Sequence, residues 1–303
     1  MVSVIIPNYN HAYYLDERIQ SVLKQTYSNY EIIILDDCST DDSKNIIEQY
    51  RNHDKVSEII YNDKNSGSPI LQWEKGIKAA NGNIIWLAES DDTCSPLFLE
   101  KLVSTFQSSN SVITFCHSNV IDQHGNIYKN AWQDNLVNNF TLDGKSFISS
   151  YLSYKNTIQN ASSVIFDKAV SLLALKEQSL LQYKSAGDWL FWTLIALKGK
   201  VSYVHESLNY YRQHRENTTS QSILNGTSAK EHVRLFKKFL SLNVIDEKEY
   251  FKRRKQQLYA VGSTLPKSIQ KEIFKMWDAS FWEIFRMKIH FQKMKLKNKF
   301  FRK

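Results

Sequence analysis

The sequence has 303 residues, of which 42% are hydrophobic, and a formal net charge of +8. This length supports one large globular domain or one domain with an appendage. No uninterrupted apolar stretch approaches the roughly 20 residues that cross a bilayer. The N-terminus also lacks the basic region and cleavage site of a signal peptide, so we expect a cytoplasmic protein.

The positive charge is concentrated at the C-terminal end. Residues 276–303 hold eight Lys and Arg against Asp278 and Glu283, and the rest of the chain is close to neutral. This distribution argues against a nucleic-acid partner. The same segment is rich in large apolar residues such as Trp282 and Phe285, and this mixture is typical of a helix on an anionic membrane surface. The alternative is a helix that packs on the protein with a solvated basic face.

The first 120 residues alternate short β-branched runs with helical patterns, as a parallel sheet with crossover helices requires. Leu15, Ile19 and Val22 have the spacing of an amphipathic helix, and Ser39–Asp42 and Ser95–Pro96 are typical helix starts. We therefore expect a doubly wound, Rossmann-like half. The predicted strands are Ser3–Ile6, Glu31–Leu35, Glu58–Tyr61, Asn83–Leu87 and Val112–Phe115.

The pattern is mixed from Gly125 to about Ser220 and becomes helical and highly charged after that, with a break at Pro266. The elements expected in the mixed part are a hairpin at 122–125, helices at 145–154 and 189–197, and strands at 162–166, 201–205 and 208–212.

Polar clusters follow three of the predicted strands, at residues 7–10, 36–39 and 89–92. Ligands of open α/β sheets bind beyond the carboxyl ends of the strands, so we expect these clusters to converge on one site. The site differs from that of a dinucleotide dehydrogenase or a P-loop NTPase, because the glycine-rich motifs of those proteins are absent from the sequence.

The third cluster places Glu89, Asp91 and Asp92 directly after the apolar run 84–87. Like charges this close raise one another's pKa, and a divalent ion such as Mg²⁺ or Mn²⁺ relieves the repulsion while keeping positions for substrate phosphates. The alternative is an acidic N-cap for the helix that begins near Pro96.

Four motifs in order resemble those of family 2 glycosyltransferases of the GT-A fold. The resemblance covers residues 1–220, which implies a nucleotide-sugar-binding half at 1–120 and an acceptor half at 121–220. Residues 221–303 are then a helical C-terminal extension. The motifs are Val4–Asn10, Ser21–Tyr27, Ile34–Asp41 and Glu89–Asp92.

The resemblance implies roles for the strand-end residues. Pro7 and Tyr9 would border the nucleotide base, and Asp37, with Asp36, would hydrogen-bond the base or ribose. Gly67 would approach the donor with its backbone. The alternatives are packing for Tyr9 and helix capping for the two aspartates.

The family's metal motif is Asp-x-Asp, whereas Glu89 occupies the first position here. The resemblance therefore implies that Asp91 and Asp92 bind the metal and ribose, with Glu89 and Ser90 beside the nucleotide sugar. Mn²⁺ or Mg²⁺ would bridge the two donor phosphates and stabilise the leaving group.

Two later motifs complete the expected site. Asp188 begins a helix where relatives carry the general base that deprotonates the acceptor hydroxyl, and Trp189 would line the acceptor pocket. Arg212 would clamp the diphosphate and His214 would add a metal ligand. A structural role is the alternative for both residues. Helix capping, for Asp188, and core packing, for Trp189, are the alternatives.

These residues together predict a metal-dependent inverting glycosyltransferase, with a nucleotide-sugar donor and a glycan or lipid-linked acceptor. The resemblance implies bacterial cell-surface polysaccharide biosynthesis, with the enzyme peripheral on the inner face of the membrane. The alternatives are a nucleotidyltransferase acting on sugar phosphates and a non-enzymatic basic membrane-binding protein. The first of these alternatives would require a basic glycine-rich loop after the first strand.

Overall fold

A computed structural model of the chain describes residues 1–128, 136–214, 222–287 and 289. The chain divides into two compact units. The first unit comprises Met1–Tyr183 and Gly187–Arg215, and the second comprises Lys184–Ala186 and Glu216–Lys303.

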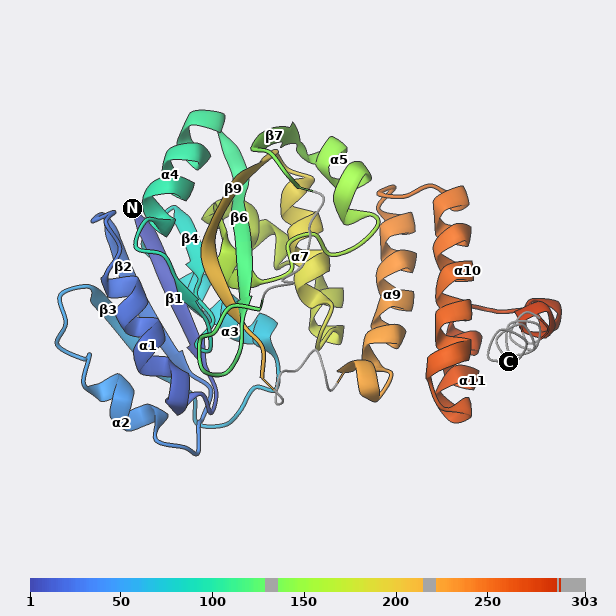
Figure 1. Cartoon of the computed structure of the whole chain (residues 1–303), viewed down its shortest axis with the longest axis horizontal. Coiled ribbons are helices and arrows are strands. Elements are labelled where there is room, and N and C mark those ends of the chain that lie inside the picture. Colours follow the sequence, from blue (N-terminus) through green and yellow to red (C-terminus); the bar gives the residue numbers. More distant parts are fainter. Residues whose placement is uncertain (129–135, 215–221, 288, 290–303) are drawn as a thin grey trace, which may run out of the picture. The chain divides into compact units, whose positions relative to one another are not determined.

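The first unit is built on a nine-stranded sheet with the order β3-β2-β1-β4-β8-β6-β9-β5, and β7 pairs with β9 (Figure 1). Strands β3, β2, β1 and β4 are parallel, and β8 is antiparallel to both of its neighbours. The strands are β1 Val2–Asn8, β2 Tyr30–Asp36, β3 Val56–Tyr61, β4 Ile84–Leu87, β5 Thr93–Cys94, β6 Ser111–Ile121, β7 Phe140–Asp143, β8 Val164–Asp167 and β9 Lys200–Arg212.

Helices connect these strands. They are α1 Ala12–Leu23, α2 Ser43–Glu48, α3 Pro69–Ala79, α4 Phe98–Ser109, α5 Gly144–Phe147, α6 Lys168–Ala174 and α7 Gly187–Ala196. A π-helical turn, Ile148–Leu152, extends α5, and 3₁₀ turns occupy Ala161–Ser163 and Gln178–Gln182.

The alternation of side chains along β1 explains how helices cover both faces of the sheet. Every residue of β1 is buried. Val4 and Ile6 belong to a core cluster that also contains Leu15 and Ile19 of α1. Ile5 points to the opposite face, where α3 approaches so closely that a Cβ on Gly76 would lie 2.4 Å from Ile5 Cγ2. Alternate residues of β1 thus face different helices, and both sets are buried, as in a sheet covered on both faces.

The predicted mixed α/β fold is confirmed, with two differences in the second half of the sheet. Residues 201–212, predicted as two strands, form the single strand β9, because the exposed residues 205–207 are part of one irregular strand rather than a turn. Strand β8 is also inserted antiparallel between β4 and β6. The sheet is therefore mixed rather than parallel across its full width.

The second unit is helical. It contains α9 Thr227–Ser241, α10 Glu247–Thr264 and α11 Lys267–Met276, and Pro266 caps α11 at the predicted break. Phe236, Phe239 and Trp277 are buried, and the Trp277 ring contacts that of Phe236. Among the described residues, no helix combines the length and hydrophobicity needed to span a membrane.

Candidate active site

The three polar clusters follow neighbouring strands of the sheet. Strands β2, β1 and β4 are adjacent and parallel, so their carboxyl ends lie at the same edge. Asn8 is paired in register with Asp36, and its Nδ2 donates to Asp36 Oδ1 at 2.8 Å. The predicted convergence of the first two clusters is therefore present as direct contact.

Asp36 and Asp37 use their carboxylates to hold loops at this edge. Asp36 accepts from the backbone N–H of Ser39 at 2.9 Å. Asp37, which is 5% exposed, accepts from Asn62, from the Ser66 backbone and hydroxyl, and from Gln72. A donor contact by either aspartate stays a prediction.

The loop held by Asp37 leads directly to Gly67, whose φ is +66°. This is a left-handed conformation that favours glycine, in agreement with a backbone rather than a side-chain role. Tyr9 is 45% exposed at the same edge, whereas Pro7 is buried within β1. Tyr9 is therefore the accessible member of the pair predicted to border the base.

The three carboxylates after β4 have different environments. Glu89 accepts from the indole N–H of Trp73 at 2.9 Å. Burial, together with the charges of Asp91 and Asp92, raises the pKa of Glu89 to about 8.

Asp92 is 1% exposed, and both of its oxygens are used inside the protein. Oδ1 accepts from the backbone N–H of Arg212 at 2.8 Å, and Oδ2 accepts from Ser162 Oγ at 2.6 Å and from Asn160 Nδ2 at 2.9 Å. Burial and the neighbouring Asp91 raise the pKa of Asp92 to about 6. Asp92 is thus an acceptor for three groups of the protein, and its metal role stays a prediction.

The Asp91 carboxylate, unlike that of Asp92, lies beside two histidines. His214 Nε2 lies 3.1 Å from Asp91 Oδ2. His11 completes a group in which one possible ligand atom from each residue lies within 4.8 Å of the others. Burial opposes ionisation of Asp91, but the His214 hydrogen bond and the His11 charge outweigh it, and the net pKa is lowered. Two imidazole nitrogens and a carboxylate oxygen are a donor set that fits a divalent transition-metal ion.

The structure therefore brings together Asp91 and His214 from the predicted metal residues and adds His11, which the sequence reasoning missed. The available signal was its position directly after Asn10, in the loop that follows β1. Ser90 is 2% exposed, and its hydroxyl lies 2.8 Å from His11 Nδ1. Ser90 thus orients His11, and its contact with the donor stays a prediction.

Arg212, predicted to clamp the diphosphate, is buried and makes its contacts within the protein. Its side chain is 2% exposed, and its guanidinium donates to the carbonyl oxygens of Asp91, Asp122 and Gln123 and to the Glu17 carboxylate. This guanidinium therefore links the loop that contains Asp91 to the end of β9. The diphosphate-clamp role of Arg212 stays a prediction, and the sequence alone does not show that these carbonyl groups surround its side chain.

Asp188 lies at the start of α7, as predicted, and is partly exposed. Its Oδ2 accepts from Asn156 Nδ2 at 2.7 Å, and its Oδ1 accepts from the backbone N–H of Trp189. Four residues after Asn156, Asn160 donates to Asp92. One short segment, residues 156–160, therefore orients carboxylates of both predicted motifs.

Trp189 is a packing residue. It is 5% exposed, and its indole N–H donates to the Leu152 carbonyl at 2.7 Å. This burial favours the alternative of core packing, and the acceptor contact of Trp189 stays a prediction.

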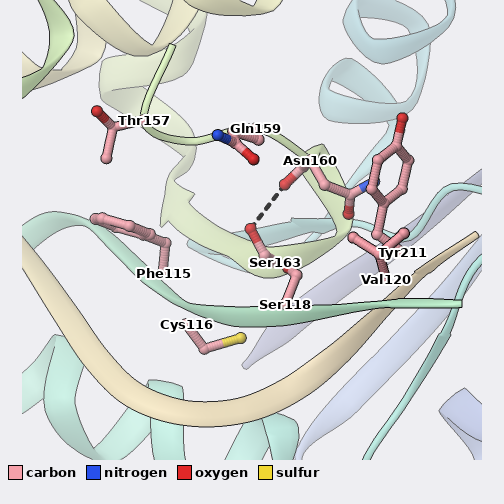
Figure 2. A pocket seen from close by; sticks show the side chains of 9 residues that line it. All are labelled: Phe115, Cys116, Ser118, Val120, Thr157, Gln159, Asn160, Ser163 and Tyr211. Carbon is pink, nitrogen blue, oxygen red and sulfur yellow. Dashed lines mark hydrogen bonds between the residues drawn. The ribbon is translucent and has the colours of Figure 1, made fainter. Parts of the chain in front are cut away.

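A small cavity lies beside the 156–160 segment (Figure 2). Its volume is about 20 Å³, which accommodates about one water molecule. Figure 2 shows Thr157, Gln159 and Asn160 on one side of it and Phe115 and Cys116 of β6 on the other. A sugar is much larger than this cavity.

The sheet and its flanking helices have the architecture of the GT-A fold. Residues 3–170 match the family model for glycosyl transferase family 2. The chain belongs to this family and is a glycosyltransferase, which sets aside the nucleotidyltransferase and non-enzymatic alternatives.

Relatives from several bacteria support this assignment. The chain is 31% identical to an uncharacterised glycosyltransferase of Nostoc sp. over 76% of this chain and 70% of the relative. It is 28% identical to TuaG of Bacillus subtilis, a glycosyltransferase named for teichuronic acid biosynthesis, over 70% of this chain and 79% of the relative.

A solved structure confirms the fold. The structure of residues 1–349 of Staphylococcus aureus TarS, determined in complex with UDP-GlcNAc, matches with a TM-score of 0.67 and 18% identity. The match covers 96% of this chain and 91% of the TarS chain. At this identity the similarity establishes the GT-A fold alone.

Proposed function

We propose that the protein is a metal-dependent inverting glycosyltransferase that moves a sugar from a nucleoside-diphosphate sugar to a hydroxyl of a glycan or lipid-linked acceptor. The observation that carries this proposal is the pairing of a carboxylate–imidazole cluster, at the strand edge, with the separate carboxylate of Asp188. The donor class is supported by the UDP-GlcNAc bound to the structurally similar TarS.

Asp91 and His214 would hold the cation, which would be Mn²⁺ or Mg²⁺ on the sequence argument. When bound, the ion would neutralise the negative charge that develops on the leaving diphosphate. Asp91 suits this role because its pKa is lowered, so that the carboxylate is ionised at neutral pH.

Asp188 would accept the proton of the acceptor hydroxyl. Asn156 and the Trp189 backbone each donate to one Asp188 oxygen, which fixes the carboxylate while leaving the residue partly exposed. A single base on the side of the sugar opposite the leaving group is sufficient for in-line displacement. The product would therefore have the anomeric configuration opposite to that of the donor.

A panel of nucleotide sugars, screened with and without Mn²⁺ for thermal stabilisation and for donor hydrolysis, tests the proposal. We expect one or a few nucleotide sugars to stabilise the protein and to be hydrolysed slowly, with both effects strengthened by Mn²⁺. A panel in which no nucleotide sugar binds under either condition would contradict the proposed donor class. Product stereochemistry, read from anomeric proton couplings, tests inversion separately.

The names of TuaG and TarS support a role in bacterial surface-polysaccharide assembly. TuaG is named for teichuronic acid biosynthesis, and TarS for the transfer of N-acetylglucosamine to poly(ribitol-phosphate). We extend only the general class to this chain, a polymer or lipid-linked glycan of the cell surface. Neither relative's particular sugar or acceptor is assigned to it.

We also propose that the C-terminal segment binds the inner face of an anionic membrane. Phe281, Trp282 and Phe285 are 74%, 66% and 44% exposed, and their rings contact one another. Trp277 and Met287 are buried, so they secure this segment within the second unit. The basic residues from Lys288 onward lie outside the described residues. In the sequence they follow directly after the aromatic group.

Vesicle co-sedimentation tests the membrane proposal. We expect binding to vesicles that contain phosphatidylglycerol and little binding to pure phosphatidylcholine. Replacing Phe281, Trp282 and Phe285 together by serine should reduce the binding, whereas the exposed Phe251→Ser change is the matched control. Equal binding by the triple variant would contradict the role of these rings.

A further inference from the structure

The remaining question at the site is the role of His11, which no predicted motif includes. Its backbone carbonyl accepts from the N–H groups of Tyr14 and Leu15 at the start of α1, at 2.9 and 3.0 Å. Its Nδ1 lies 2.8 Å from the hydroxyl of the buried Ser90. Backbone and ring are therefore both held in place, in the way that a hydrogen bond to one ring nitrogen orients the other nitrogen of a metal-binding histidine.

The second observation is the convergence of three chain segments on one point. His11 follows β1, Asp91 follows β4 and His214 follows β9. The imidazole rings of His11 and His214 are 5.7 Å apart between centroids and nearly perpendicular. All three residues are only partly exposed, and their possible ligand atoms lie within 4.8 Å of one another.

We propose that His11 is a third protein ligand of the cation and that the resulting set of two imidazoles and one carboxylate selects a transition-metal ion such as Mn²⁺ over Mg²⁺. Mg²⁺ prefers oxygen ligands in a strict octahedral arrangement, whereas Mn²⁺, a divalent transition metal, accepts imidazole nitrogen as well as oxygen ligands. The inference deepens the proposed function, on which it rests for the purpose of the metal.

Asp92 supports this assignment by its orientation. Because its oxygens accept from Arg212, Ser162 and Asn160, the second aspartate of the motif is occupied within the protein. A site made of Asp91 and His214 alone would offer two protein ligands. His11 raises the number to three and leaves the remaining coordination positions for substrate phosphate and water.

Binding of Mn²⁺ alone, without nucleotide, is the direct test. The signal of free Mn²⁺ in electron paramagnetic resonance reports the unbound ion in a titration of the whole chain. We expect His11→Ala and His214→Ala each to weaken Mn²⁺ binding at least about 10-fold, by comparison with the effect of even outer-sphere changes at metal sites. His53→Ala, at an exposed histidine outside the site, is the matched control and should bind as the wild type does.

Selectivity is measured by competition in the same titration. We expect a 100-fold excess of Mg²⁺ to leave most of the Mn²⁺ bound to the wild type. His11→Asp, which replaces nitrogen by oxygen, should shift the preference toward Mg²⁺. Ready displacement of Mn²⁺ from the wild type by equimolar Mg²⁺ would overturn the selectivity claim.

A measurement on the unaltered protein guards against a variant that does not fold. Pulsed electron paramagnetic resonance detects ¹⁴N nuclei coordinated to bound Mn²⁺, and we expect the wild type to show two histidine nitrogens. A spectrum with one nitrogen, or unchanged Mn²⁺ affinity in a folded His11→Ala variant, would overturn the proposal.

The nucleotide-sugar panel separates the two levels of the argument. Two coordinated nitrogens in a protein that binds no nucleotide sugar would uphold the metal site and contradict the proposed function. Donor hydrolysis by a protein with one coordinated nitrogen would uphold the function and reject His11 as a ligand.

Discussion

The two units each contain a buried carboxylate that accepts hydrogen bonds from the protein itself. The first unit also contains partly exposed carboxylates. Asp92 in the first unit and Glu231 in the second are each 1% exposed. Each accepts hydrogen bonds from backbone N–H groups of segments distant in the sequence. Asp91 and Asp188, in the first unit, are partly exposed. A buried carboxylate whose oxygens all accept from the protein stabilises the fold, whereas a partly exposed one keeps access to a ligand, which is what the roles proposed for Asp91 and Asp188 require.

The largest effect is expected for Asp188→Asn, because this change removes the proposed base while keeping the shape of the side chain. Loss of general-base catalysis should lower turnover about 10²–10⁴-fold with nucleotide affinity largely unchanged. Initial rates and nucleotide titrations measure the two quantities. Asp246→Asn, at the exposed N-cap of α10, is the control. Near-normal turnover in Asp188→Asn would remove Asp188 as the base.

Glu89→Gln tests the cost of burying a carboxylate beside Asp91 and Asp92 at the strand edge. The folded-state pKa of Glu89, about 8, lies above its ordinary value of 4.5. The folded protein therefore keeps a proton that the unfolded chain loses, and stability falls as the pH rises between these values. We expect the variant to gain about 2–4 kcal/mol in unfolding free energy at pH 8, since one pKa unit corresponds to about 1.4 kcal/mol, and little at pH 4.5.

Denaturant unfolding of Glu89→Gln at the two pH values measures this gain. Glu58→Gln, at an exposed position on β3, serves as the control and should show no such pH dependence. An equal effect of Glu89→Gln at both pH values would contradict the raised pKa of Glu89 as the cause of the gain in stability.

Glu231→Gln tests the buried carboxylate of the second unit. Glu231 accepts from the backbone N–H groups of Lys184, Ser185 and Ala186 at 2.7 to 2.9 Å. An amide has one acceptor oxygen in place of two, so a buried N–H loses its partner, at a cost of about 1–3 kcal/mol. Urea unfolding should show this loss, and Glu272→Gln, whose side chain is 55% exposed, should change stability much less. Equal stability of the two variants would contradict the stabilising role of the buried Glu231 carboxylate.

The smallest effect is expected for Glu31→Gln. Burial raises the pKa of Glu31, but hydrogen bonds from Ser3 and Asn81 outweigh it, and the net pKa is lowered. The ionised carboxylate therefore stabilises the fold above about pH 4.5, and this contribution is lost as the pH falls through the folded-state pKa. We expect a loss of about 1 kcal/mol at pH 7, measured by denaturant unfolding, that disappears in acid. A loss that persists at pH 3 would contradict the electrostatic explanation.

The sequence predicted the first half of the fold because its signals are local. The β-branched runs before Pro7 and Asp36 and the helix spacing of Leu15 and Ile19 depend on neighbours a few residues away. The antiparallel insertion of β8 and the continuity of β9 depend on pairing between distant segments, and the sequence analysis did not predict them.

The sequence by itself determined the family, the sheet edge where the polar clusters meet, and the acidic group after β4. Only the tertiary structure decided which groups the adjacent residues Asp91 and Asp92 each contact. Asp91 meets His11 and His214, while Asp92 meets donors from Asn160, Ser162 and Arg212. The physical reason is that the role of a carboxylate depends on which donors surround each oxygen, and these donors come from segments that only the folded chain brings together.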